Sequence, residues 1–166
     1  RIKDGLSNIL YWGFAQMGGL ALVRVNRFRT AVNQAQLQAA CQLIAATPRP
    51  TLFEIKALGL PQFSAVSFVS KVRMFLDPDR SATLDQQIMK IHNVSQSTVL
   101  ASVRRSKTSI PVTKANSLAY ESWCDRLEFI RNTYLPTLRV VDIERGLFYF
   151  VQSGQVAVAA QLLANA

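Results

Sequence analysis

The feature that constrains the fold most is a pair of short helical segments joined by a tight turn. Thr51 and Glu54 have the spacing of a capping box, in which each side chain accepts a hydrogen bond from the backbone amide of the other residue. A turn is expected at residues 60–61, and Ser64 is expected to cap the second helix. That helix must end ahead of Pro78, because proline lacks the amide that a helix requires.

Helical patterns continue over most of the remaining chain. Apolar residues recur at helical spacing after Asn33, which is expected to cap that helix, and again over residues 116–134. A Gly-Gly turn at residues 18–19, an extended stretch at 81–84 and an irregular region at 93–114 are expected to interrupt the pattern. Further helices are expected at residues 86–91, from 139 onward and at 155–166. The predicted fold class is therefore all-α.

The chain is strongly basic, with 19 Lys and Arg residues against 10 Asp and Glu residues in a total of 166. Arginine predominates among the basic residues, and its planar guanidinium suits two-point contact with phosphate oxygens. Nucleic acid is therefore the leading candidate partner, although many soluble proteins are basic without binding it. With 49% apolar residues, the chain can bury the core of one domain or of two closely packed lobes.

Several classes of site are disfavoured by the residues that are scarce. His92 is the single histidine, which makes a histidine-based metal site and a Ser-His-Asp hydrolase poor candidates. Cys41 and Cys124 lack a CxxC partner and are expected to be buried thiols. No apolar run is long enough to cross a membrane, and the first residues do not resemble a signal peptide. We therefore expect a soluble, cytoplasmic protein that uses no metal, no small-molecule cofactor and no membrane.

Two motifs carry a resemblance to a known superfamily. The segment Leu60-Pro61-Gln62-Phe63-Ser64 is followed, after a helix and a short loop, by Thr83-Leu84-Asp85. Their order and spacing resemble the helix-hairpin-helix DNA glycosylase superfamily, in which the hairpin reads roughly Leu-Pro-Gly-Val-Gly and a catalytic aspartate caps the next helix. Residues 68–79 and 140–148 look specifically like the bacterial proteins with an 8-oxoguanine DNA glycosylase-like fold. The resemblance covers about residues 11–150.

The resemblance implies both a fold and a function. The fold would be one two-lobed, helical glycosylase-like domain over residues 1–166 with a cleft between the lobes. Its parts would be the hairpin region at about 51–77, the loop of the catalytic aspartate at about 78–92 and C-terminal helices at about 116–166. The function would be excision of a modified base, such as an oxidised purine, from double-stranded DNA, with the base flipped out of the stack. Such a protein would be associated with the nucleoid, and its oligomeric state is left open.

The resemblance also implies roles for individual residues. Asp85 would stabilise the positive charge that develops at C1′ of the sugar, and Lys71 is the candidate amine that attacks C1′. Contacts with DNA are expected from the hairpin backbone at the start of a helix and from basic side chains. The residues expected to bind DNA are Gln62, Ser64, Ala65, Val66, Arg73, Arg104, Arg105 and Lys107. The flipped base would lie against Tyr11, Trp12, Phe14 and Phe148.

The chain departs from the family pattern at the hairpin and at the lysine. Gln62 and Ser64 replace both hairpin glycines, and Val66 stands where bifunctional members carry the lysine that forms a Schiff base. Lys71 lies five residues later, which rotates it by roughly 140° around a helix. Three alternatives remain open: the lysine is placed differently here, Lys71 has a structural or phosphate-binding role, or the enzyme is monofunctional and uses Asp85 with water.

Other residues have simpler interpretations, and other functions remain possible. Asp85 by itself is a plain helix cap, and Trp123 is expected to lie in the core. Asp142 and Glu144 lie about 200° apart on a helix, so at most one faces a given cleft, and one is expected to form a buried salt bridge with an arginine such as Arg139 or Arg24. The alternatives to a glycosylase are a non-catalytic DNA-binding protein that retains the scaffold and a helical protein-interaction module whose charge is incidental.

Overall fold

The computed structural model describes residues 1–165, and all regular structure in that part of the chain is helical, which confirms the all-α fold class. The one β-type contact among these residues is an isolated antiparallel bridge between Ala65 and Pro111. Two short 3-10 helices are η1 (Ala15–Met17) and η2 (Val99–Ser102). The α-helices are α1 (Ile2–Phe14), α2 (Leu20–Ala31), α3 (Gln34–Ala46), α4 (Leu52–Ala57), α5 (Val66–Leu76), α6 (Lys90–Val94), α7 (Lys114–Tyr134), α8 (Val140–Gln152) and α9 (Val156–Asn165).

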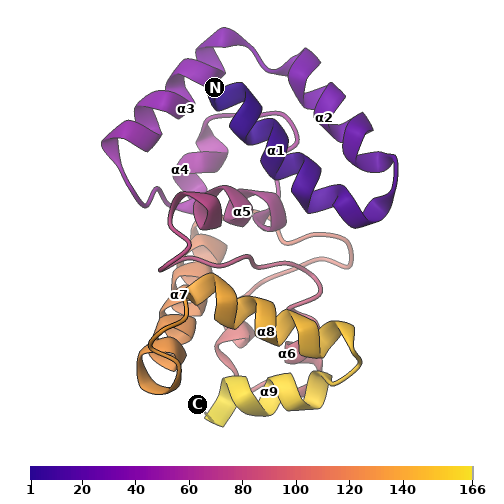
Figure 1. Ribbon diagram of the computed structural model, residues 1–166, viewed down its shortest axis with the longest axis vertical. Helices are drawn as coiled ribbons and strands as arrows, with labels where there is room; N and C mark the ends of the chain where they lie inside the picture. The colour runs from indigo at the N-terminus through magenta and orange to yellow at the C-terminus, as the bar shows by residue number, and fades with distance from the viewer. Residues whose placement is uncertain (166) are drawn as a thin grey trace.

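The helices form two groups along the longest axis of the molecule, with the two chain termini in different groups (Figure 1). Helices α1 to α4 form one group, α6 to α9 form the other, and α5 lies between them (Figure 1). One cluster of buried apolar side chains runs through both groups, from Leu6 of α1 to Leu163 of α9. Removal of this apolar surface from water is the main force that holds the two groups together.

Helix starts and stops follow the sequence signals in the region of α3 to α5. Reciprocal capping boxes are present at Asn33 before α3 and at Thr51 before α4. Helix α5 ends at Leu76, directly ahead of Asp77 and Pro78, as the proline stop predicts. The start of α4 and the end of α5 are therefore where the sequence places them.

The start of α5 differs from the sequence prediction. The helix begins at Val66 and its cap residue is Ala65, whose side chain makes no capping bond, so the prediction that Ser64 caps it is wrong. The Val66 amide donates instead to the carbonyl oxygen of Ile110 at 2.9 Å. A distant loop, through the bridge at Pro111, thus satisfies an amide that a capping side chain usually satisfies.

The extended segment at residues 81–85 is held by side chains from two helices. The Tyr120 hydroxyl donates to the carbonyl oxygen of Ala82 at 2.8 Å, and the Trp123 indole N–H donates to that of Thr83 at 3.1 Å. From α5, the hydroxyl of Ser70 accepts a hydrogen bond from the Leu84 amide at 3.1 Å. Trp123 is fully buried, which confirms its core position, and these bonds fix the backbone that leads to Asp85.

Two local predictions need correction. Cys124 is buried as expected, but Cys41 lies on the exposed side of α3, whose packed face is formed by Leu37 and Ala40. The helix expected at residues 86–91 is instead a turn at 86–89 followed by α6, since Asp85 caps a single turn before the helix begins. Among the helices at residues 1–165, none combines the length and the apolar character needed to cross a membrane.

Candidate functional site

Lys71 lies on α5 and is only 7% exposed. Its Nζ donates to the carbonyl oxygen of Ser67 at 2.9 Å and lies 5.1 Å from the ring centre of Phe68 and 5.9 Å from that of Trp12. Gly13 on α1 makes this packing possible, because a Cβ there would come within 2.5 Å of the Phe68 ring. The amine is thus held under aromatic rings where α1 crosses α5.

Two carboxylates act on this amine. Burial lowers the pKa of the Lys71 ammonium, and the nearby Asp85 and Glu144 carboxylates partly oppose that shift. A lysine whose pKa is lowered has a larger neutral fraction near pH 7, and only the neutral amine is a nucleophile. The structure therefore brings Lys71 and Asp85 into one electrostatic cluster, although Lys71 lies well around the helix from Val66.

Asp85 is fixed by the turn that it caps. Its Oδ1 accepts hydrogen bonds from the amides of Gln87 at 2.9 Å and Ile88 at 3.1 Å, which confirms the capping role. No group within residues 1–165 donates to Oδ2. One oxygen is therefore used to hold the carboxylate in place, and the other remains for a positive charge or a water molecule.

Glu144 is the third titratable member of the cluster, and the sequence named it only as one of two acids that could be site residues, without deciding between it and Asp142. It is 4% exposed, and its carboxylate makes no hydrogen bond and no ion pair within the described part of the chain. Burial first, and then the Asp85 carboxylate, raise the pKa of Glu144 to about 8, while Lys71 and Arg145 oppose the rise. The carboxyl group is therefore largely protonated at neutral pH.

The expected buried salt bridge on α8 is not formed. Asp142 pairs with Arg139 at 2.9 Å, but that pair lies at the surface and closes the capping box of α8. Arg24 donates instead to the side-chain oxygen of Gln62 at 3.0 Å. Glu144, the buried acid, is thus left without the arginine that the sequence suggested for it.

The hairpin turn uses a non-glycine residue in a conformation typical of glycine. Gln62 has φ +70°, in the left-handed region, and its side chain is bound by Arg24 as described above. Gln62 stands at the position of the first glycine in the hairpin pattern that the sequence resembles, and its φ is one that glycine adopts readily. Among the hairpin amides, that of Val66 is occupied by Ile110 and is not free for a phosphate, which corrects the expectation for that residue. Ser64 is exposed and Ala65 is half-buried, and the amides of both lack an acceptor among residues 1–165.

Arg73 is not available to DNA. Its side chain is buried, and the guanidinium donates to both carboxylate oxygens of Glu121 at 3.0 Å and to the carbonyl oxygen of Pro50 at 2.6 Å. The expected phosphate contact is therefore wrong, because the fork that would bind phosphate already binds a carboxylate. The residue ties α5 to α7 and to the chain ahead of α4.

The three basic residues of the 104–107 loop have different surroundings. The guanidinium of Arg105 donates to the side-chain oxygens of Gln86, at 2.9 Å, and Asn93. It thus fastens the loop to the residue that follows Asp85. The side chains of Arg104 and Lys107 are exposed, and within residues 1–165 neither has a hydrogen-bond or ion-pair partner.

The aromatic residues expected in a base pocket lie mainly along α1. Trp12 packs edge-on against Phe75, and Phe14 stacks on Phe68 with ring centres 4.5 Å apart. Tyr11 is half exposed and makes no aromatic contact in the described residues, and Phe148 is half-buried one turn after Glu144 on α8. Phe68, which the sequence analysis did not name as a site residue, is central to this group. Its position three residues before Lys71 on the same helix could have indicated that the two side chains lie close together.

Two surface hollows formed by described residues are lined by neither Lys71 nor Asp85. One, of about 640 Å³, lies among α7, α8 and α9 and is mostly apolar. The other, of about 470 Å³, lies between η2 and α7 beside Arg104. No set of three or more His, Cys, Asp or Glu side chains within residues 1–165 is arranged to hold a metal ion. Lys71 and Glu144 are buried, whereas Asp85 is half-buried.

Comparison with known proteins adds no assignment: no family model, no curated protein and no solved structure matches this chain.

Proposed function

We propose that the protein is a DNA glycosylase that excises a modified base from duplex DNA. The observation that carries the proposal is the convergence of a buried, low-pKa amine, Lys71, with a carboxylate, Asp85, whose backbone is clamped by α5 and α7. Buried titratable groups that perturb one another are concentrated at catalytic sites. The left-handed hairpin residue Gln62 and the aromatic side chains of α1 support the same proposal.

The chemistry assigns a separate task to each group. The neutral Nζ of Lys71 forms a bond to C1′ while the bond from C1′ to the base breaks, and the base leaves with that electron pair and takes up a proton. Asp85 stabilises the positive charge on the sugar during this exchange. The nitrogen, which then carries two protons and a positive charge, loses one proton; the C1′–O4′ bond breaks, O4′ takes up a proton, and a protonated Schiff base forms, from which the strand can be cut. If Lys71 does not attack, Asp85 can direct a water molecule to the same carbon.

Access to the amine requires side-chain movement. Phe68 and Trp12 lie over Nζ, and α1 packs closely on both Phe68 and Lys71 at Gly13. Trp12 is half exposed, so its rotation away from Lys71 would open a path from the surface. A flipped base that stacks on Phe14 or Phe68 would replace these ring contacts.

The covering of Lys71 also favours one alternative from the sequence, a non-catalytic DNA-binding protein on the same scaffold. In that protein, Lys71 would remain under its aromatic rings and the charge excess alone would attract DNA. Such a protein would bind damaged or bent duplexes with strong salt dependence and would release no base.

A panel of duplexes with single modified bases tests the proposal. Release of a base is read by alkali cleavage, and a Schiff base is read by trapping with borohydride. Excision with trapping is expected for the wild type. Lys71→Met should abolish trapping and Asp85→Asn should abolish excision, whereas Lys90→Met, which removes an exposed lysine of α6, should leave both unchanged. Absence of excision on every duplex, with salt-dependent binding intact, would support the non-catalytic alternative.

A further inference from the structure

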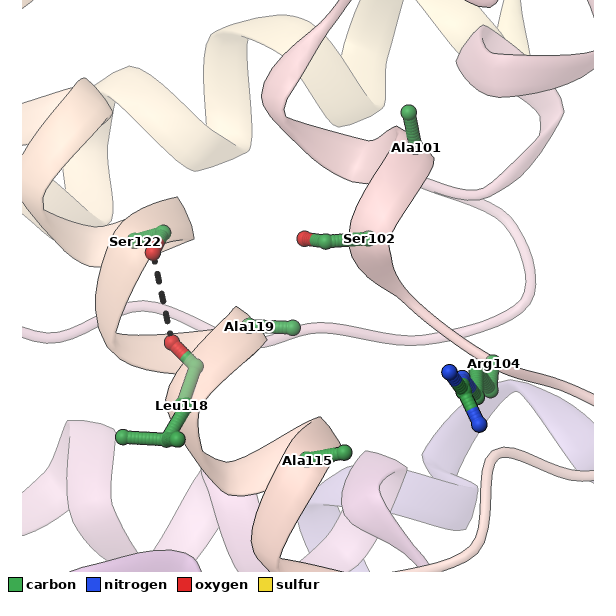
Figure 2. Close-up of a pocket in the computed structure, with 7 residues that line it drawn as sticks. All are labelled: Ala101, Ser102, Arg104, Ala115, Leu118, Ala119 and Ser122. Carbon is green, nitrogen blue, oxygen red and sulfur yellow. Dashed lines mark hydrogen bonds between the residues drawn. The ribbon is translucent and has the colours of Figure 1, made fainter.

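The hollow between η2 and α7 is formed by small side chains around one cation. Figure 2 shows Ser102 reaching from η2 toward α7, with Ala115 and Ala119 facing it and Arg104 at the other side of the opening. Ser122 lies one helical turn beyond Leu118, and its hydroxyl donates a hydrogen bond to the Leu118 carbonyl oxygen at 3.3 Å (Figure 2). The hollow measures about 470 Å³, so it accommodates a phosphate group with part of the attached sugar.

The backbone of Arg104 is held from both sides by one buried side chain. Asn116, 1% exposed, accepts a hydrogen bond from the Arg104 amide at 2.8 Å and donates to the Arg104 carbonyl oxygen at 2.7 Å. A third bond runs from the same amide group of Asn116 to the carbonyl oxygen of Pro111 at 2.8 Å. The loop therefore presents Arg104 at a fixed position beside the hollow, which lowers the entropy cost of binding a ligand there.

The guanidinium of Arg104 has no partner of its own within residues 1–165, and the nearest acids along the chain are Asp85, which caps a turn, and Glu121, which pairs with Arg73. Residues 86–120 contain five Lys and Arg residues and no Asp or Glu. Arg105 is bound to Gln86 and Asn93, so it secures the loop while Arg104 remains free. An unpaired guanidinium is suited to an oxyanion such as phosphate.

The position of the loop indicates where the phosphate comes from. Gln86, the residue after Asp85, accepts a hydrogen bond from Arg105 and donates to the carbonyl oxygen of Ser106 at 3.2 Å. The hollow is therefore joined to the candidate active site through one short loop. We infer that it binds one backbone phosphate of the DNA strand whose nucleotide enters the site at Asp85, through the Arg104 guanidinium. The Ser102 and Ser122 hydroxyls line the hollow and donate to the carbonyl oxygens of Val99 at 3.1 Å and Leu118 at 3.3 Å. This inference rests on the proposed function and deepens it.

The test compares two variants that each remove one positive charge. Arg104→Ala removes the proposed contact, and Arg27→Ala removes an exposed arginine of α2, in the other group of helices, as the matched control. Affinity for a modified duplex is measured by fluorescence anisotropy from about 50 to 200 mM salt. Arg104→Ala is expected to bind the duplex about tenfold more weakly than the wild type and to reduce the slope of log affinity against log salt by about 1. Its loss of affinity should be larger than that of Arg27→Ala. Arg104→Lys should restore the slope but only part of the affinity, because lysine lacks the planar fork.

A second measurement separates DNA phosphate from free phosphate. Amide chemical shifts of Ser102 and Ser122 are followed by NMR while inorganic phosphate or the duplex is added. Shifts with the duplex that are lost in Arg104→Ala support the inference. Saturation by phosphate alone, with duplex affinity equal in Arg104→Ala and Arg27→Ala, would overturn it and assign the hollow to a free anion. Absence of excision by the wild-type protein, with Arg104-dependent binding of the duplex intact, would count against the proposed function and leave this inference standing.

Discussion

Glu144→Gln removes one buried carboxyl group and keeps the shape of the side chain. The pH-dependent effect of that carboxyl group on the free energy of unfolding can therefore be measured. The pKa of this carboxyl rises from an ordinary value of 4.5 to about 8 in the folded protein. The folded state therefore holds its proton while the unfolded chain releases it. The resulting loss of stability is absent below the unfolded pKa, grows as the pH rises from 4.5 to 8, and is complete above 8.

The size of the effect follows from the shift. Each pH unit in this window corresponds to about 1.4 kcal/mol, so the full shift corresponds to about 5 kcal/mol. Between pH 5 and pH 7 the free energy of unfolding of Glu144→Gln should rise relative to that of the wild type by about 2 to 3 kcal/mol. The glutamine amide does not titrate, so the cost of burying it is the same at every pH. It therefore cancels when the difference between the two proteins is compared at two pH values.

Urea denaturation of both proteins at pH 5, 6, 7 and 8 gives this difference. Asp125→Asn is the control, because Asp125 is exposed and makes no hydrogen bond or ion pair in the described part of the chain. Its difference from the wild type should stay constant over the same range. A Glu144→Gln difference that is equally constant would refute the assignment of a buried, protonated carboxyl group and with it the electrostatic cluster at Lys71.

Four further substitutions test the structure. Lys71→Met should stabilise the protein at pH 7 in thermal melts, because burial lowers the pKa of the Lys71 ammonium, and the gain should fade as the pH approaches 10.5, where the unfolded lysine also loses its proton. Arg73→Met should lower the free energy of unfolding in urea by about 2 to 4 kcal/mol, since the Pro50 carbonyl group and the Glu121 carboxylate lose their donor. Ser70→Ala should cost about 1 to 3 kcal/mol by the same measurement, because the buried Leu84 amide loses its acceptor, and should also slow any excision through Asp85. Gln62→Val should cost about 2 kcal/mol in the left-handed turn, whereas Gln62→Gly should remain within about 1 kcal/mol of the wild type.

The sequence predicted best the features that depend on neighbouring residues. Capping at Asn33 and Thr51 and the stop at Pro78 involve a few adjacent residues, and all three are present. The cap at Asp85 is likewise local, although the turn that follows is shorter than the expected helix. The failure at Ser64 has the opposite cause, because the partner of the helix end, Ile110, lies more than 40 residues away in the chain.

Buried charges were harder to foresee, although the helix periodicity carried a signal. Arg73 was assigned to DNA from its charge, but it continues the buried stripe of Val66, Val69 and Ser70 along α5. Glu144 in the same way occupies a position in the buried stripe of α8 with Ile143 and Leu147. For Arg73, the charge suggested a surface position and the spacing suggested a buried one, and the structure agrees with the spacing; for α8, one buried acid was expected, and that acid is Glu144. Helix spacing does not predict the ion-pair partner of a buried charge. Arg73 pairs with Glu121, whereas Glu144 forms no ion pair within the described residues.

Helix packing alone does not account for the Lys71 cluster. Asp85 is explained as a cap, but Lys71 and Glu144 each lose solvation on burial and form no ion pair of 4.0 Å or less within the described residues. Apolar side chains of similar size would fill the same space at lower free-energy cost. Retaining an amine and two carboxylates at one point is reasonable if the amine must be neutral and a carboxylate must be fixed, as attack at C1′ requires. Lys71→Met should therefore both raise the stability of the protein at pH 7 and abolish borohydride trapping to DNA. If Lys71→Met raises the stability without any loss of excision or trapping, the cluster destabilises the fold and has no role in that chemistry.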